Sequence, residues 1–279
     1  MSLRYLTTTL AAFALVAALA SSAQAVAWVS TADGGADTSI QNDCQGATGI
    51  DCGVDPDGRA HTVYGAGSSA EFRRLDDVRQ KLVLLKFDIS TLDASSYADA
   101  VLRLDINHNR TRTYRVYGIG EDYDDWDESI TSYSNAPGIL QPDQGGSAYG
   151  SAGNNFLDAS ELYLPGAPNP QRPNPFQLGT IGYIDTRSLP GGRGAVMSDP
   201  FNLDLEDFLN ADTDGFVSFL IFLDASDGAP AGNVATKETT GNILAAPALG
   251  VLPAFLVPEP STALLALAGV MGLMARRRS

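Results

Sequence analysis

Acidic side chains are the chemically active groups that this sequence concentrates most. Six carboxylates fall within residues 121–128, and such a cluster can supply the oxygen ligands that Ca²⁺ accepts in irregular geometry. A solvated acidic loop is the alternative, and the sequence leaves both open. Residues 210–215 resemble half of an EF-hand loop, but Ile221 occupies the twelfth position, where a bidentate glutamate belongs, so a turn between a helix and a strand explains them better. Calcium is therefore the candidate cofactor, and the metal ligands stay unassigned.

Groups suited to catalysis are scarce by comparison. The chain has two histidines, two cysteines and only three lysines, Lys81, Lys86 and Lys237, whereas these residue types are the usual general bases, nucleophiles and zinc ligands. No nucleophile elbow, zinc-protease motif or phosphate-binding loop occurs, and no spacing singles out a carboxylate pair for glycoside cleavage. We expect a non-enzymatic protein with no catalytic residues. Two alternatives stay open: a secreted polysaccharide-degrading lyase or glycosidase, and a purely structural surface protein without a ligand.

The charge balance excludes nucleic acid as a partner. Binding to a phosphate backbone depends on lysine and arginine contacts that release counterions, whereas this chain has 18 basic and 33 acidic residues and a formal net charge of −15. With 44% hydrophobic residues, the 279-residue chain can build a core. The part that remains after both ends are set aside, residues 26–256, fits one large domain.

The N-terminus predicts export. Arg4 provides a positive start, residues 10–20 form an uncharged apolar run, and Ala23 and Ala25 form an A-x-A cleavage site. Residues 1–25 are therefore predicted to be a signal peptide with a helical apolar segment, and the mature chain to begin at Val26. In an oxidising compartment, Cys44 and Cys52 are predicted to form a local disulfide.

The C-terminus combines three ordered elements. They are the Pro258, Glu259 and Pro260 triplet, an uncharged run over residues 262–275, and the cluster of Arg276, Arg277 and Arg278. The run predicts a short transmembrane helix, and the arginines are expected to stay on the cytoplasmic side. The prolines prevent the helix from extending upstream and place an extended junction just outside the membrane.

These elements resemble the PEP-CTERM sorting signal of Gram-negative bacteria that make extracellular polysaccharide, which assigns residues 257–279 to that signal. The resemblance implies recognition by an exosortase, a membrane cysteine protease-transpeptidase that removes the tail. It also implies a localisation. The exported precursor is held transiently in the inner membrane, and the body is then delivered to the cell surface or the extracellular matrix.

Hydrophobic periodicity in the body favours strands. Ala100, Leu102, Leu104 and Ile106 alternate with more polar positions, as in a half-buried strand. Residues 82–89 are more continuously apolar and suit a central strand, and residues 216–223 are the strongest candidate for a buried strand. Further strand candidates are residues 113–119, 233–238 and 249–252, and one helix is expected near residues 203–209. Residues 142–175 have no period and predict a long surface loop. The sequence thus predicts a mostly β, antiparallel fold with long loops.

Three segments of the body resemble, in order, the DNRLRE-type module of bacterial secreted and cell-wall proteins. They are residues 82–90 (LVLLKFDIS), 98–104 (ADAVLRL) and 126–137 (WDESITSYSNAP). Residues 37–38 resemble the opening strand of that module and residues 215–238 its closing pair, so the resemblance covers about two thirds of the body. It implies a single antiparallel, jelly-roll-like β-sandwich related to carbohydrate-binding modules, and hence a surface or matrix protein with extracellular polysaccharide as its partner.

Two groups of side chains have a sugar-binding interpretation and a structural one. Trp126 could stack on a sugar ring, or its indole could cap a sandwich edge while Glu128 accepts hydrogen bonds, and the structural role is favoured because a fixed corner needs the same residues. Four arginines fall around one predicted hairpin and could clamp uronate carboxylates, although solvated strands carry such residues routinely. They are Arg103, Arg110, Arg112 and Arg115.

Replacing Pro258 and Pro260 with alanine tests the sorting signal. The prolines keep the junction extended, which is the form that a protease engages, so we expect the double variant to accumulate as a full-length, membrane-retained species. The native sequence should give a shorter product outside the cell. Immunoblots of fractions from strains with and without exosortase measure this, and identical size and location in both strains would contradict the sorting interpretation.

Overall fold

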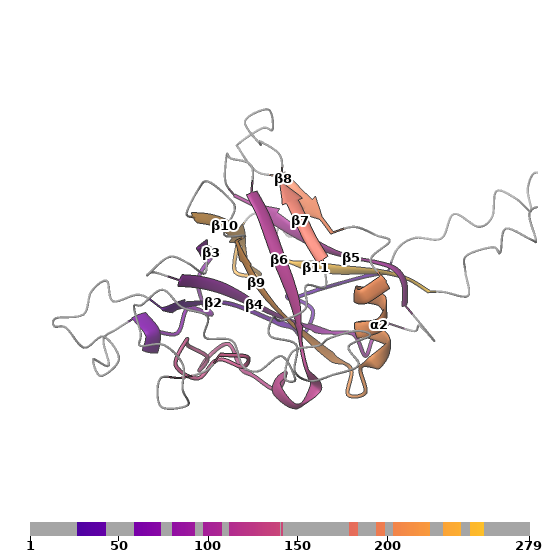
Figure 1. The fold of residues 1–279 in the computed structure, drawn as a ribbon, viewed down its shortest axis with the longest axis horizontal. Coiled ribbons are helices and arrows are strands. Elements are labelled where there is room, and N and C mark those ends of the chain that lie inside the picture. The colour runs from indigo at the N-terminus through magenta and orange to yellow at the C-terminus, as the bar shows by residue number, and fades with distance from the viewer. Residues whose placement is uncertain are drawn as a thin grey trace, which may run out of the picture.

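The structure is a computed structural model that describes residues 27–42, 59–73, 80–92, 97–107, 112–139, 141, 179–183, 194–198, 203–223, 231–240 and 246–253. Within these residues the chain forms eleven strands in two sheets and one α-helix (Figure 1). Every strand pairing found in the described residues is antiparallel. The prediction of a mostly β, antiparallel fold is confirmed.

The two sheets have six and five strands. The first follows the order β1 (Ala27–Ser30), β11 (Ala248–Pro253), β5 (Tyr97–Ile106), β10 (Ala231–Ala235) and β3 (Ser69–Arg73), with β8 (Gly194–Met197) also paired to β5. The second follows the order β2 (Ala36–Asn42), β4 (Gln80–Asp88), β9 (Phe216–Leu223), β6 (Arg112–Ile119) and β7 (Gly179–Tyr183). The segments predicted as a central strand and a buried strand, β4 and β9, are indeed interior strands of the second sheet.

A shared core lies between the sheets. The alternating residues of β5 point into it, and all four are buried: Ala100, Leu102, Leu104 and Ile106. Phe219 of β9 lies opposite them, with its ring centroid 5.8 Å from that of Phe87 in β4. The helix α2 (Leu203–Ala211) closes one end of this core, where Phe208 lies 5.4 Å from Phe219 between ring centroids.

The second sheet is also buried on its outer face, which explains the continuous apolar runs in its strands. Leu82 and Leu84 of β4 belong to a second apolar cluster that includes Trp126 and Tyr133. Those two side chains come from the irregular segment that follows β6 and contains the 3₁₀ turn η2 (Glu121–Tyr123). Both faces of β4 are therefore covered, so neither set of alternate residues needs to be polar.

The predicted arginine hairpin is wrong. Arg103 lies in β5 of the first sheet, whereas Arg112 and Arg115 lie in β6 of the second, where β6 pairs with β9 and β7. The chain crosses between sheets after β5 because the apolar faces of β5 and β6 both contact the shared core from opposite sides. Arg110 lies outside the described residues, as does the 142–175 loop.

Several other predictions concern segments outside the described residues. These are the signal peptide with Ala23 and Ala25, the cysteine pair Cys44 and Cys52, and the tail from residue 257. Among the helices that the structure describes, none has the length and apolar character needed to cross a membrane.

Truncating Phe219 to alanine tests the shared core. The ring is fully buried between Phe87 and Phe208, and its removal leaves a cavity as well as the lost transfer free energy, so we expect a loss of about 3–5 kcal/mol in the free energy of unfolding. Urea unfolding of the exported protein measures this. Ile130→Ala is the control, because Ile130 is 63% exposed. Equal effects of the two substitutions would contradict the core assignment.

Candidate functional site

The corner around Trp126 is a structural site rather than a sugar platform. The indole is only 6% exposed, and its Nε1–H donates to Oγ of Ser218 at 3.0 Å. Lys86 lies over the ring, 5.3 Å from its centroid, and donates to the Trp126 carbonyl oxygen. A sugar ring therefore has no free indole face to stack on, and the structural interpretation of Trp126 is the one observed.

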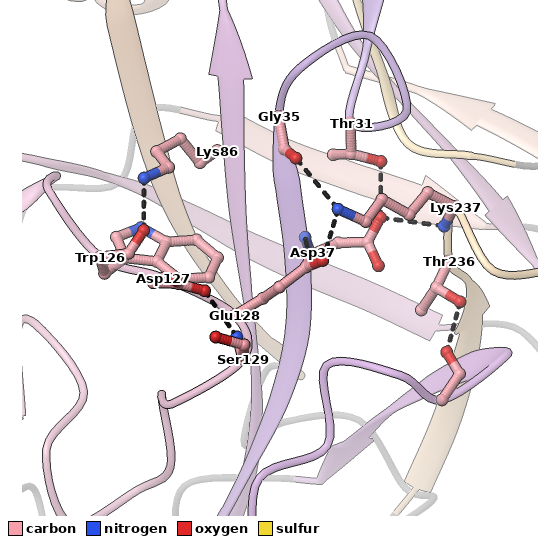
Figure 2. A network of polar contacts seen from close by, with 11 residues as sticks. Thr31, Gly35, Asp37, Lys86, Trp126, Asp127, Glu128, Ser129, Thr236 and Lys237 are labelled. Atoms are coloured by element: carbon pink, nitrogen blue, oxygen red, sulfur yellow. Dashed lines mark hydrogen bonds and ion pairs between the residues drawn. The ribbon is translucent and has the colours of Figure 1, made fainter.

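Glu128 joins three segments that are distant in the sequence (Figure 2). Its Oε2 accepts the Asp37 N–H at 3.1 Å, and its Oε1 lies 2.6 Å from Nζ of Lys237. The same ammonium group donates to the Gly35 carbonyl oxygen at 3.1 Å. The carboxylate thus connects the start of β2, the Trp126 corner and the turn after β10. It accepts hydrogen bonds as the sequence suggests, and its partners are a backbone N–H and a lysine.

Asp37 is the buried group at the centre of this network (Figure 2). Its Oδ2 accepts the Thr31 hydroxyl at 2.5 Å and the Lys237 N–H at 3.0 Å, while its Oδ1 is buried and has no hydrogen-bond partner in the described part of the chain. Desolvation raises the pKa of Asp37 to about 7, although those two hydrogen bonds lower it. Because the side chain is fully buried, it has no access to a substrate.

The rest of the corner is held by its own side chains. Asn135 Oδ1 accepts the Ser132 N–H at 2.7 Å, and its Nδ2 donates to the Ile130 carbonyl oxygen at 2.9 Å. Tyr133 is fully buried, and its hydroxyl donates to Gln80 Oε1 at 3.1 Å. The residues that carry the sequence resemblance over 126–137 therefore anchor this segment to the second sheet.

The acidic run over residues 121–128 does not act as one cluster. Glu128 belongs to the network above, Asp127 accepts hydrogen bonds within a local turn, and Asp125 is exposed. Glu121 and Asp124 face elsewhere and line a cavity of about 170 Å³ together with residues 211–212 and 216–217. The two halves of the run thus have different surroundings.

The turn between α2 and β9 supplies two further acidic groups, Asp212 in the lining of this cavity and Asp214 close to Asp212 and Glu121. Gly215 has a φ of +90°, which favours glycine. Asp212 Oδ2 accepts the Gly215 N–H at 2.9 Å, and Asp214 Oδ1 accepts the Phe216 N–H at 2.8 Å. The turn interpretation of residues 210–215 is confirmed. One carboxylate oxygen each from Glu121, Asp212 and Asp214 also lie within 4.8 Å of one another.

Burial and mutual repulsion raise the pKa values of two groups in this acidic cavity. Desolvation raises the pKa of Asp124 to about 7, with further increases from the negative charges of Asp214, Glu121 and Asp212 and an opposing effect from Lys86. Desolvation likewise raises the pKa of Asp212 to about 6. The folded protein therefore holds these carboxylates close together at a cost in free energy.

A separate aromatic surface lies on the outer side of the first sheet. Trp28 of β1 is 43% exposed and pairs with Gly250 of β11. A Cβ atom built on Gly250 would lie 2.8–2.9 Å from three carbons of the indole benzene ring. The ring therefore lies directly on the glycine backbone. The sequence patterns did not point to Trp28, and the available signal was a tryptophan at the third position of the predicted mature chain.

Comparison with known proteins identifies the tail and not the body. Residues 256–278 match the PEP-CTERM protein-sorting motif, a span that includes the Pro258, Glu259 and Pro260 triplet and the three terminal arginines. No curated protein matches the chain. The sorting prediction is confirmed: the motif indicates an exported protein with a membrane-anchored precursor that exosortase processes in Gram-negative bacteria.

The raised pKa of Asp37 predicts that stability falls as pH rises. The folded state keeps this proton up to about pH 7 and the unfolded chain loses it near 3.8, so unfolding releases a proton between these values. We expect the Asp37 contribution to the free energy of unfolding to fall by on the order of 3 kcal/mol from pH 4 to 7. Asp37→Asn, which keeps an acceptor for Thr31, should weaken this decline.

Urea unfolding of the exported protein at several pH values measures the effect. Asp124 and Asp212 add a decline of the same sign, so the slope of the Asp37 variant should be reduced and not abolished. The control is Asp125→Asn, which removes an exposed carboxylate. Parallel pH profiles for native protein and the Asp37 variant would contradict the assignment.

Proposed function

We propose that this exosortase-sorted protein is a non-enzymatic component of the cell surface or extracellular matrix, and that it contacts extracellular polysaccharide through Trp28. The observation that supports this proposal is that the Trp28 indole lies on Gly250 while 43% of Trp28 is exposed. A flat aromatic ring fixed on a sheet provides an apolar surface for a sugar ring at little conformational cost.

The strand register supports a platform around this ring. Trp28 pairs with Gly250 of β11, and Gly250 pairs in turn with Val101 of β5, so these three residues lie side by side across the first sheet. Two residues further along β5, Arg103 pairs with the exposed Met197 of β8. Arg103 lies on the outer face of this sheet because its neighbours along β5 point into the shared core. The surface therefore combines an aromatic ring with apolar side chains, and such groups contact the apolar face of a sugar ring.

Electrostatics restricts the kind of polysaccharide. Arg4 and the three terminal arginines account for four of the 18 basic residues, so residues 26–260 have 14 basic against 33 acidic residues and a formal charge of about −19. Such a field repels polyanions unless cations bridge them. We infer that the Trp28 surface takes neutral sugar residues directly and acidic polysaccharides only in the presence of divalent cations.

The fold assignment in this proposal is a DNRLRE-like, jelly-roll-like β-sandwich. Its support is the order of the resembling segments, together with two antiparallel sheets over one core. The corner residues of the resemblance hold the covering segment in place through Glu128, Asn135 and the Trp126 indole. In this assignment they are scaffold residues, and the ligand surface lies on the other sheet.

The non-enzymatic assignment rests on where the titratable groups lie. Asp37 is fully buried in the network and Glu128 is paired with Lys237. Asp124 and Asp212, whose pKa values are raised, line the same cavity beside one another. The apolar walls of that cavity come from Phe208, Phe216 and Val217. Glycoside cleavage needs an acid and a base on opposite sides of a bond, and a lyase or glycosidase would need that arrangement in an open cleft.

Trp28→Ala tests the proposed surface. We expect binding to the polysaccharide that the producing strain exports to weaken by roughly tenfold or more, because a central tryptophan commonly dominates an interface. Affinity electrophoresis of the exported protein in gels containing that polysaccharide measures this. Ile130→Ala, which truncates another exposed apolar side chain, should bind like the native protein.

Tryptophan fluorescence provides an independent measurement. The chain has two tryptophans, Trp28 exposed and Trp126 buried, so acrylamide quenching reports mainly on Trp28. Added polysaccharide should protect the native protein from quenching. Absence of binding by the native protein, or full binding by Trp28→Ala, would overturn the proposed contact.

A further inference from the structure

Two acidic segments that are distant in the sequence meet at the cavity beside α2. The Thr213 N–H and hydroxyl both donate to Oε1 of Glu121, 92 residues away, which joins the α2–β9 turn to η2. Glu121, Asp212 and Asp214 each place one oxygen within 4.8 Å of the others. Oxygens bound to one Ca²⁺ at about 2.3–2.6 Å are at most about 5 Å apart, so these three can share one ion.

The carboxylates of Asp124 and Asp212 provide an independent indication of a cation site. Asp124 lines the same cavity and is only 2% exposed, yet its carboxylate makes no hydrogen bond or ion pair with the described residues. In addition, Oδ1 of Asp212 is buried and has no hydrogen-bond partner in the described part of the chain, while its Oδ2 accepts the Gly215 N–H. A buried carboxylate oxygen without a donor is costly, and a bound cation would satisfy the Asp212 oxygen and offset the charge of Asp124.

The described protein groups do not neutralise this cavity. Lys86 acts on Asp124 electrostatically, but its ammonium donates to the Trp126 carbonyl oxygen and lies over the Trp126 and Phe216 rings. Apolar walls from Phe208, Phe216 and Val217 lower the local dielectric and strengthen the repulsion among the carboxylates. The unfavourable charge is therefore built into the fold.

We propose that Glu121, Asp212 and Asp214, beside the cavity that Asp124 also lines, bind one Ca²⁺ ion. Three carboxylates supply hard oxygen ligands in an irregular arrangement, the negative charge of Asp124 adds to the attraction for the ion, and water completes the coordination. Mg²⁺ fits less well, because it requires regular octahedral geometry and loses its water reluctantly. The ion links η2 to the α2–β9 turn and so stabilises the end of the core that α2 closes.

Isothermal titration calorimetry of the exported protein, freed of metal with EGTA, tests the site with CaCl₂ as the probe. We expect one ion per chain and a melting temperature that rises with calcium, because a ligand bound only by the folded state stabilises it. MgCl₂ at the same concentration should produce a smaller shift. A melting curve that millimolar calcium leaves unchanged would overturn the proposal.

Asp124→Asn and its neighbour Asp125→Asn form a matched pair with the same change in charge. Asp125 is exposed, so its variant should bind calcium like the native protein. Asp124→Asn should lower calcium affinity at least tenfold and, without calcium, should raise the melting temperature because it removes a repelled charge. Equal calcium affinities for the two variants would contradict the assignment.

Glu121→Gln provides a second variant that does not depend on a buried position. The amide oxygen can still accept both hydrogen bonds from Thr213, so the junction is kept while one charged ligand is lost. Its calcium affinity should also fall. Native affinity in this variant would overturn the ligand set. None of these measurements involves polysaccharide, so failure of the calcium site and failure of the Trp28 surface are distinguishable.

Discussion

The contact of Glu128 with the Asp37 N–H and the Lys237 ammonium is the constraint on which the arrangement of this protein depends. A partly buried charge is costly when its partner is absent, so this pair fixes the covering segment against β2 and the turn after β10. That segment carries Trp126 and Tyr133, which cover the outer apolar face of the second sheet. Without it, β4 and β9 would expose that face to water.

An acid-rich exported protein must place many carboxylates, and several of those described here stabilise local turns. Asp33, Asp88, Asp212 and Asp214 each accept backbone N–H groups two or three residues away. A carboxylate used in this way stabilises a turn and stays solvated. The cavity beside α2 is different, because there the turn carboxylates also face Glu121 and the buried Asp124. The same side chains therefore take part both in local turn formation and in the proposed cation site.

The two proposed ligand surfaces belong to different elements. Trp28 lies on β1 and β11 of the first sheet, whereas the acidic cavity lies between η2 and the turn that precedes β9. Sugar contact and cation binding can therefore be altered separately by substitution. Under the proposed function, a matrix that contains polysaccharide and divalent cations supplies a ligand for each proposed surface, and bound calcium reduces the repulsion between the acidic body and acidic polymers.

The sequence by itself determined the sorting tail, because its motif is continuous in the chain. It also determined the mostly β class and the strands with a clear pattern, because hydrophobic periodicity reflects which side of a strand is buried. The alternation in β5 and the apolar run of β9 are of this kind. Tertiary structure alone decided the rest. β1 and β8 have four residues each, too few for a period, and a pattern shows that a face is buried but not what covers it. The crossing between β5 and β6, the meeting of Glu121 with Thr213, and the position of Trp28 on Gly250 join residues far apart in the chain, and such pairings follow only from packing of the whole molecule.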